Sequence, residues 1–95
     1  MSDINITRQD GPNGGRYFII VNGDEAEMTY SRAGASRIII DHTGVPDSMR
    51  GLGIGRRLVE AAVNDARTEG HKIIPLCPFA KATLAKHAEW QDAVQ

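Results

Sequence analysis

The spacing of the apolar residues changes near the middle of the chain, and this change constrains the fold more than any other feature. In residues 24–30, "DEAEMTY", apolar and polar residues alternate, so that Ala26, Met28 and Tyr30 share one side. Such a period of two is typical of a strand with one buried face. Between residues 54 and 66 apolar residues recur every four positions, which is typical of an amphipathic helix. The sequence therefore predicts strands followed by a long helix.

The segments around this change predict the remaining elements. A short strand is expected at Ile4 and Ile6, and further strands at residues 16–21, 24–30 and 37–43. The dipeptide "NG" at positions 22 and 23 predicts a tight hairpin, because both central residues of such a turn take positive φ. In the fourth strand, alternation puts Ile38, Ile40 and His42 on one side.

The second half of the chain predicts a helix, a strand and a helix. Gly70 is expected to end the long helix, and "HKIIPLC" predicts a fifth strand that two prolines confine to an edge or a strand end. Residues 80–90 predict a last helix. The strand–helix–strand unit at residues 38–76 is long enough for parallel pairing. The expected fold class is α/β (α+β), with a mixed, mostly antiparallel sheet and β-β-β-β-α-β-α order.

Composition indicates an ordinary globular protein. The 95 residues are expected to form a single domain, residues 1–95, with one modest core. A net charge of −1 argues against nucleic-acid or membrane partners, which require a concentrated basic surface. The lone cysteine and an N-terminus without an apolar signal segment favour a cytoplasmic location. The spacing of the three histidines predicts no metal site.

The segment "RGLGIG", residues 50–55, holds three glycines directly before the long helix. It lacks the Lys-Ser/Thr of a P-loop. It does not follow a strand directly, and no acid lies about 20 residues further on, as a dinucleotide fingerprint requires. Two interpretations stay open. One is a tight turn with packing glycines. The other is an anion site, where the free N–H groups and positive dipole end of the helix receive a pyrophosphate, with Arg50 and Arg56 at its rim.

The same segment resembles the Arg/Gln-x-x-Gly-x-Gly/Ala signature of the GNAT superfamily of acyl-CoA N-acyltransferases, at Arg50, Gly53 and Gly55. Residues 38–94 are similar to a small single-domain subfamily in "HT-x-V-P", "PLCPF" and a "H-x-E-aromatic" ending. The resemblance implies a truncated GNAT-like fold that binds acetyl-CoA. The pyrophosphate is then expected on residues 50–56, which include Gly51. The pantetheine arm is expected beside Thr43 and Val45, where the fourth and fifth strands splay apart.

The resemblance also implies an N-acetyltransferase in which an unidentified amine attacks the thioester directly. Cys77 and His42 are the candidate catalytic residues. Cys77 is interpreted as the acid for the departing thiolate, as a nucleophile with a lowered pKa, or as a small buried hydrophobic residue. His42 is interpreted as a general base or as a hydrogen-bonded strand residue. Many members of the superfamily use a tyrosine acid, but no motif assigns that role to Tyr17 or Tyr30.

The chain departs from larger members of the superfamily between its first two strands. Those members carry two helices there that help to form the acceptor site, whereas this chain has only "DGPNGG". The acceptor side is therefore expected to be open, or completed by a partner or a second subunit in a homodimer. A non-catalytic, CoA-responsive or protein-interaction module is the alternative function, and nucleotide binding is a third.

Overall fold

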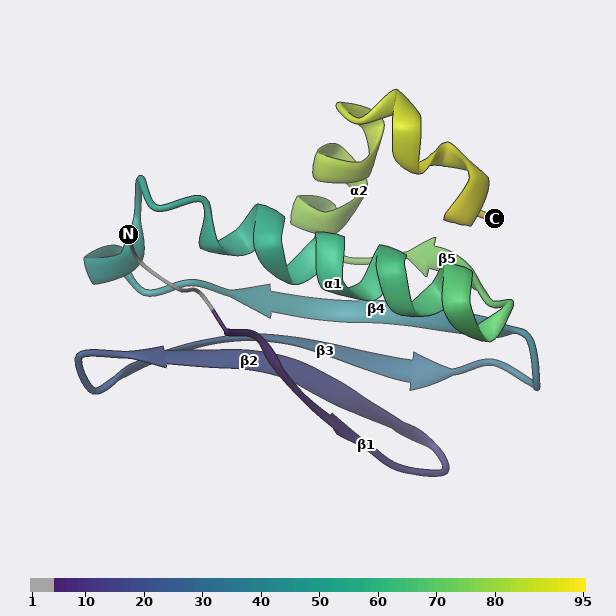
Figure 1. Ribbon diagram of the computed structural model, residues 1–95, viewed down its shortest axis with the longest axis horizontal. Helices are drawn as coiled ribbons and strands as arrows, with labels where there is room; N and C mark the ends of the chain where they lie inside the picture. Colours follow the sequence, from purple (N-terminus) through teal and green to yellow (C-terminus); the bar gives the residue numbers. More distant parts are fainter. Residues whose placement is uncertain (1–4) are drawn as a thin grey trace.

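The computed structural model describes residues 5–95 as one five-stranded sheet with helices on one face (Figure 1). The strands are β1 (Thr7–Asp10), β2 (Gly14–Val21), β3 (Asp24–Arg32), β4 (Arg37–Gly44) and β5 (Lys72–Pro75), and they lie in that order across the sheet. The helical segments are η1 (Asp47–Met49), α1 (Ile54–Glu69), α2 (Pro78–Ala85) and η2 (Ala88–Ala93). β1 to β4 pair antiparallel, and β4 and β5 pair parallel. The predicted fold class and element order are confirmed.

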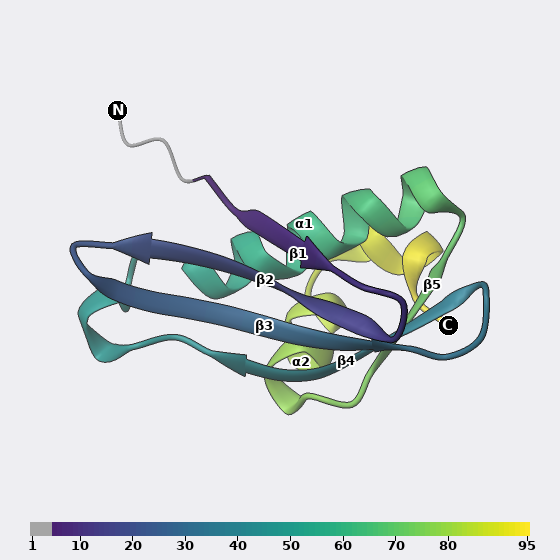
Figure 2. The same ribbon diagram turned by 90° about the horizontal axis from the view of Figure 1, so that it is seen from below.

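Figure 2 views the molecule from below, with the sheet in front and α1 and α2 behind it. In the described part of the chain, only strands and their connecting loops lie on the near face. β1 and β2 are joined by the short segment 11–13, so no helix intervenes between them. No helix within residues 5–95 is both long and apolar enough to cross a lipid bilayer.

The β2–β3 hairpin forms where the sequence predicts it. Asn22 and Gly23 have φ values of 52° and 84°, and Val21 pairs with Asp24 on either side of them. The first strand differs in its bounds, because β1 begins at Thr7 and the half-buried Ile6 precedes it. Ile4, on which part of that prediction rests, lies outside the described residues.

The core lies between the sheet and α1. Ala26, Met28 and Tyr30 of β3 are buried, which confirms the predicted alternation. The four-residue stripe of α1 faces them, and every member is buried: Ile54, Leu58, Val59, Ala62, Val63 and Ala66. Full burial of each large aliphatic side chain stabilises the fold by about 1.5–3 kcal/mol. Gly70 ends α1 with φ 74°, and its N–H bonds the carbonyl of Ala66, as a left-handed cap does.

A β-bulge corrects one predicted side-chain direction. Tyr30 pairs with Ile40, whereas the preceding residue of β3, Thr29, pairs with His42. Asp41 is therefore an extra residue in β4, and the alternation inverts beyond it. His42 leaves the buried side that Ile38 and Ile40 share, and Thr43 takes its place opposite the buried Met28. The predicted common side for His42 and the two isoleucines is wrong.

The predicted helix at residues 80–90 is also wrong in its bounds. α2 begins at Pro78, whose fixed φ suits a first helical position, and ends at Ala85. The N–H groups of Lys86 and His87 bond carbonyls three residues earlier, which tightens the last turn before η2. The predicted edge position of the fifth strand is confirmed, because β5 is the last strand of the sheet.

Candidate functional site

β4 and β5 part after a short parallel pairing. Their last paired residues are Ile40 and Pro75. The N–H groups of Leu76 and Cys77 then both bond the carbonyl of Ile40, at 3.1 and 3.0 Å, before the chain turns into α2. β4 itself continues to Gly44. Residues 41–44 therefore have no strand beside them on the β5 side within the described chain.

A cavity of about 560 Å³ lies between the start of α1 and one face of α2. Six of the seven residues that sequence analysis assigned to the cofactor line it: Val45, Arg50, Gly51, Gly53, Gly55 and Arg56. The seventh, Thr43, lies instead against Cys77. The cavity also includes Phe79, Thr83, Lys86 and His87, which come from α2 and the residues that follow it.

The first turn of α1 ends at this cavity with free backbone donors. Gly53 precedes the helix without a side-chain cap, and the first hydrogen bond runs from the N–H of Arg57 to the carbonyl of Gly53, at 3.1 Å. The N–H groups of Ile54, Gly55 and Arg56 find no acceptor within residues 5–95. No acidic residue lies in this turn. Free donors and the positive end of the helix dipole make the turn suitable for an anion.

Two different physical requirements explain why glycine occupies positions 51, 53 and 55. Gly51 and Gly53 have φ values of 84° and 72°, and a Cβ built on either meets nothing within 4 Å. These two permit a left-handed backbone and leave the space in front of the helix open. A Cβ on Gly55 would instead lie 2.4 Å from Cζ of Phe79. The packing interpretation therefore applies to Gly55, whereas Gly51 and Gly53 leave open space in which an anion site stays a prediction.

Comparison with known proteins identifies the family. A model of GCN5-related N-acetyltransferases matches residues 16–93. The chain belongs to this family. It is also similar to a GCN5-like protein from Staphylococcus aureus that was solved in solution by NMR, with 39% sequence identity and a TM-score of 0.76. The match covers 100% of this chain and 91% of that one. No curated protein matches the sequence.

The family's general chemistry is acetyl transfer, and Cys77 lies just after the point where β4 and β5 part. Cys77 is buried at the residue before α2, and its Sγ lies 3.4 Å from Oγ1 of Thr43. Burial raises the pKa of the thiol, but hydrogen bonds from the Thr43 hydroxyl and from the backbone N–H groups of Ala80, Phe79 and Thr43 outweigh it. The net pKa lies below the ordinary thiol value. A larger thiolate fraction makes the sulfur a better nucleophile at neutral pH.

His42 lies on the opposite side of β4 from Cys77. Thr43 contacts Cys77, and the neighbouring His42 is exposed on the other face, opposite Thr29. A Cβ built on Gly44 would lie 3.4 Å from its Nε2, so the ring extends along the strand toward Gly44. His42 lines a second cavity of about 370 Å³, together with Glu25, Glu27, Gly44, Val45 and Pro46. Val45 borders both cavities.

The rim of the first cavity is basic. Nε of Arg50 pairs with Asp47 at 2.9 Å, and both side chains are exposed. Sequence analysis did not identify Lys86, which also lines the cavity. An exposed lysine carries no sequence signal of its own, and only the packing of α2 against α1 reveals its position. The His87 ring stacks on Trp90 with centroids 4.0 Å apart, and its Nδ1 lies 3.1 Å from Glu89.

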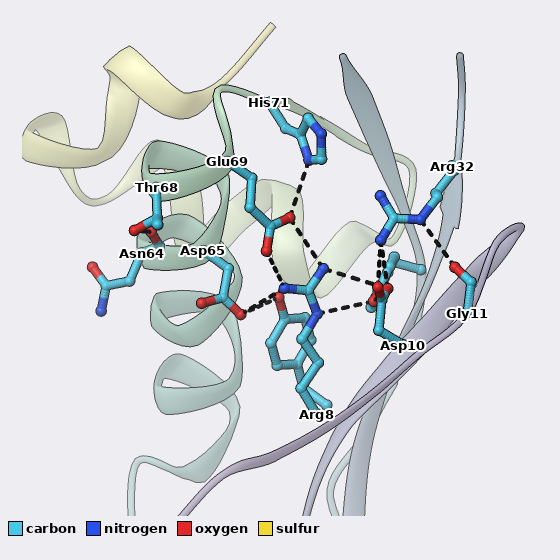
Figure 3. A network of polar contacts seen from close by, with 11 residues as sticks. Arg8, Asp10, Gly11, Arg32, Asn64, Asp65, Thr68, Glu69 and His71 are labelled. Carbon is cyan, nitrogen blue, oxygen red and sulfur yellow. Dashed lines mark hydrogen bonds and ion pairs between the residues drawn. The ribbon is translucent and has the colours of Figure 1, made fainter. Parts of the chain in front are cut away.

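The two tyrosines lie in a polar cluster at the other end of α1 from the cavity. The Tyr17 hydroxyl donates to Asp65 at 2.8 Å, and the Tyr30 hydroxyl donates to Asp10. Figure 3 shows this cluster, in which Arg8 reaches Asp10, Asp65 and Glu69 from β1. Neither tyrosine lines the cavity. Within residues 5–95, no group of three histidines, cysteines or carboxylates could hold a metal ion.

Proposed function

We propose that the chain binds acetyl-CoA in the cavity between α1 and α2 and transfers the acetyl group to an amine. One observation carries this proposal. The uncapped first turn of α1 borders a cavity that is also lined by Val45, which follows β4, and by Phe79, which follows Cys77 by two residues. Acetyl-CoA has a diphosphate suited to this turn, an amide-bearing arm suited to the end of β4, and a thioester at its end.

The cofactor's diphosphate would accept hydrogen bonds from the backbone N–H groups that open α1, while Gly51 and Gly53 allow close approach. Arg50 and Arg56 would add charge beside it. The pantetheine arm would lie beside β4 near Thr43 and Val45, where backbone groups of residues 41–44 face no strand. Its amides would pair with those groups as an added strand does.

The chemical step follows from these positions. A neutral amine attacks the thioester carbon, a C–N bond forms, and the C–S bond breaks as the electron pair leaves on sulfur. Backbone N–H groups stabilise the oxyanion that develops on the carbonyl. His42 takes the proton from the amine nitrogen, which would enter through the second cavity, across Val45 from the cofactor. The departing thiolate takes a proton from Cys77 or from solvent.

The lowered pKa of Cys77 also permits a covalent route. The thiolate would attack the thioester and release CoA, and the amine would then attack the S-acetyl group of Cys77. Mass spectrometry of the intact protein after incubation with acetyl-CoA separates the two routes. An acetyl adduct that is absent in Cys77→Ser and discharged by amine identifies the nucleophile. Turnover without an adduct supports direct attack of the amine on the thioester.

Calorimetric titration with acetyl-CoA tests the proposal, and two adjacent arginines supply a matched pair of variants. Arg56 lines the cavity and Arg57 does not, although both are exposed on α1. We expect Arg56→Ala to weaken binding about fivefold or more, because a charge-assisted contact with phosphate is lost, and Arg57→Ala to leave binding unchanged. Absence of binding by the parent protein, or equal affinities for both variants, would contradict the proposal.

The bare face of the sheet favours a second candidate. Because residues 11–13 alone join β1 and β2, no described helix covers the face of the sheet from which an acceptor would enter. A non-catalytic module that senses CoA, or that meets a partner or second subunit across this face, fits that openness. Such a module would bind acetyl-CoA but acetylate none of a panel of amines, and Cys77→Ala would not alter its affinity.

A further inference from the structure

The face of α2 that lines the cavity ends in two basic residues. Phe79, Thr83 and Lys86 are spaced by four and three positions and therefore lie on one side of the helix, and His87 follows. This face lies across the cavity from the first turn of α1. The cavity thus has two walls that can bind anions, whereas a diphosphate needs only the wall formed by α1.

Thr83 gives this second wall an unused polar group. The residue is only 8% exposed and lines the cavity, yet its hydroxyl makes no hydrogen bond within residues 5–95. By contrast, the hydroxyl of Thr68 in α1 bonds the carbonyl of Asn64, four residues earlier, at 3.0 Å. Helical threonines commonly make that local bond. The Thr83 hydroxyl is not a buried atom without a partner, so it lies at the accessible wall of the cavity, where it can bond a ligand atom.

Lys86 and His87 lie beside Thr83, at the far end of α2 from Cys77. The eight residues of α2 span about 12 Å, so the backbone of Lys86 lies roughly that far from Cys77. Lys86 is exposed and forms no ion pair within the described chain. Its ammonium is therefore available for a second anion, separate from the one at α1.

We infer that Thr83, Lys86 and His87 form a phosphomonoester subsite that binds the 3′-phosphate of coenzyme A. The inference rests on the proposed binding of acetyl-CoA, and it adds the ligand group that these residues recognise. The Thr83 hydroxyl and the Lys86 ammonium donate to the phosphate oxygens, and His87 borders them, held by its stack on Trp90. The protein then distinguishes coenzyme A from 3′-dephospho-coenzyme A and from adenosine diphosphate.

Calorimetric titration of the full chain with coenzyme A and with 3′-dephospho-coenzyme A tests this inference. We expect the parent protein to bind coenzyme A about five- to tenfold more tightly, the effect of an accessible charged hydrogen bond. Lys86→Ala should lower this preference to about twofold or less while leaving affinity for the dephospho form unchanged. Lys81→Ala is the matched control, because Lys81 is an exposed lysine of the same helix that does not line this cavity.

Thr83→Val is a second variant, which removes the hydroxyl but keeps the shape of the side chain. We expect it to reduce the preference by about two- to threefold. Equal affinity of the parent protein for both ligands would overturn the subsite and leave the proposed function standing. An unchanged preference in Lys86→Ala, or an equal loss for both ligands, would also overturn it. Absence of binding of either ligand to the parent protein would overturn the subsite and the proposed function together.

Discussion

The two ends of helix α1 differ in how their charges and backbone groups are satisfied. At the C-terminal end, Asp65 and Glu69 receive the guanidinium of Arg8, with Nη1 at 3.1 and 2.5 Å from their carboxylate oxygens. At the N-terminal end, the N–H groups of the first turn find no acceptor among the described residues and border a cavity. The carboxylates at one end are paired within the protein, and the other end has backbone donors left for a ligand.

Both ends also carry charges that the helix dipole disfavours. Glu69 is the last residue of α1, where a negative charge is unfavourable, and Arg56 and Arg57 lie in the first turn, where positive charges are unfavourable. Arg8 offsets the first mismatch from β1. Nothing within residues 5–95 offsets the second. An unfavourable charge that has a partner inside the protein contributes to the structure. An unfavourable charge that has no such partner and lies beside a cavity indicates a site for a ligand.

Among the variants that test this difference between the two ends of α1, removal of Arg8 should have the largest effect on stability. Its side chain is 19% exposed, contacts three carboxylates and donates to the Tyr30 hydroxyl. Arg8→Met leaves Asp10, Asp65 and Glu69 close together without their cation. We expect the free energy of unfolding in urea to fall by about 2–3 kcal/mol. Arg57→Met, at an exposed position in the first turn of α1, should change the free energy of unfolding by no more than about 0.5 kcal/mol. Equal effects of the two variants would remove the distinction between the ends.

The pH dependence of stability should come partly from the C-terminal end. Hydrogen bonding from Arg8 lowers the pKa of Glu69 below its usual 4.5. A lowered folded-state pKa contributes stability above pH 4.5, and this contribution is lost as pH falls through the folded-state value. Glu69→Gln should therefore lose less stability than the parent protein between about pH 6 and pH 3, by about 0.5–1 kcal/mol. Glu60→Gln, which alters no ion pair within the described chain, should follow the parent curve.

The smallest expected effect is a shift in the pKa of the Cys77 thiol. The Thr43 hydroxyl helps to hold the pKa of Cys77 below its ordinary value. Thr43→Val removes this hydrogen bond and should raise the pKa, so the pH midpoint for alkylation of Cys77 by iodoacetamide should move upward. Thr43→Ser keeps the hydroxyl and should retain the parent midpoint. A midpoint that stays unchanged in the valine variant would show that the backbone N–H groups alone set the pKa.

The sequence predicts what depends on local spacing. The Asn22–Gly23 hairpin, the alternation in β3 and the stripe of α1 are all set by residues within a few positions of one another. The bulge at Asp41 depends on how β4 aligns with β3, so alternation within one strand gives the wrong side for His42. The contact between Gly55 and Phe79 joins residues far apart in the sequence, as does the position of Lys86 at the cavity.

Chemical-shift mapping by two-dimensional NMR, during titration of the isotope-labelled protein with acetyl-CoA, tests the central claim most directly. The claim is that the free backbone N–H groups opening α1 receive the cofactor's diphosphate. The account predicts the largest amide shifts at Gly51 to Arg56, and little change at Asp65 to His71 around the C-terminal end of α1. Largest shifts in the Arg8 cluster, or no shifts in the segment 51–56 at saturating cofactor, would contradict it.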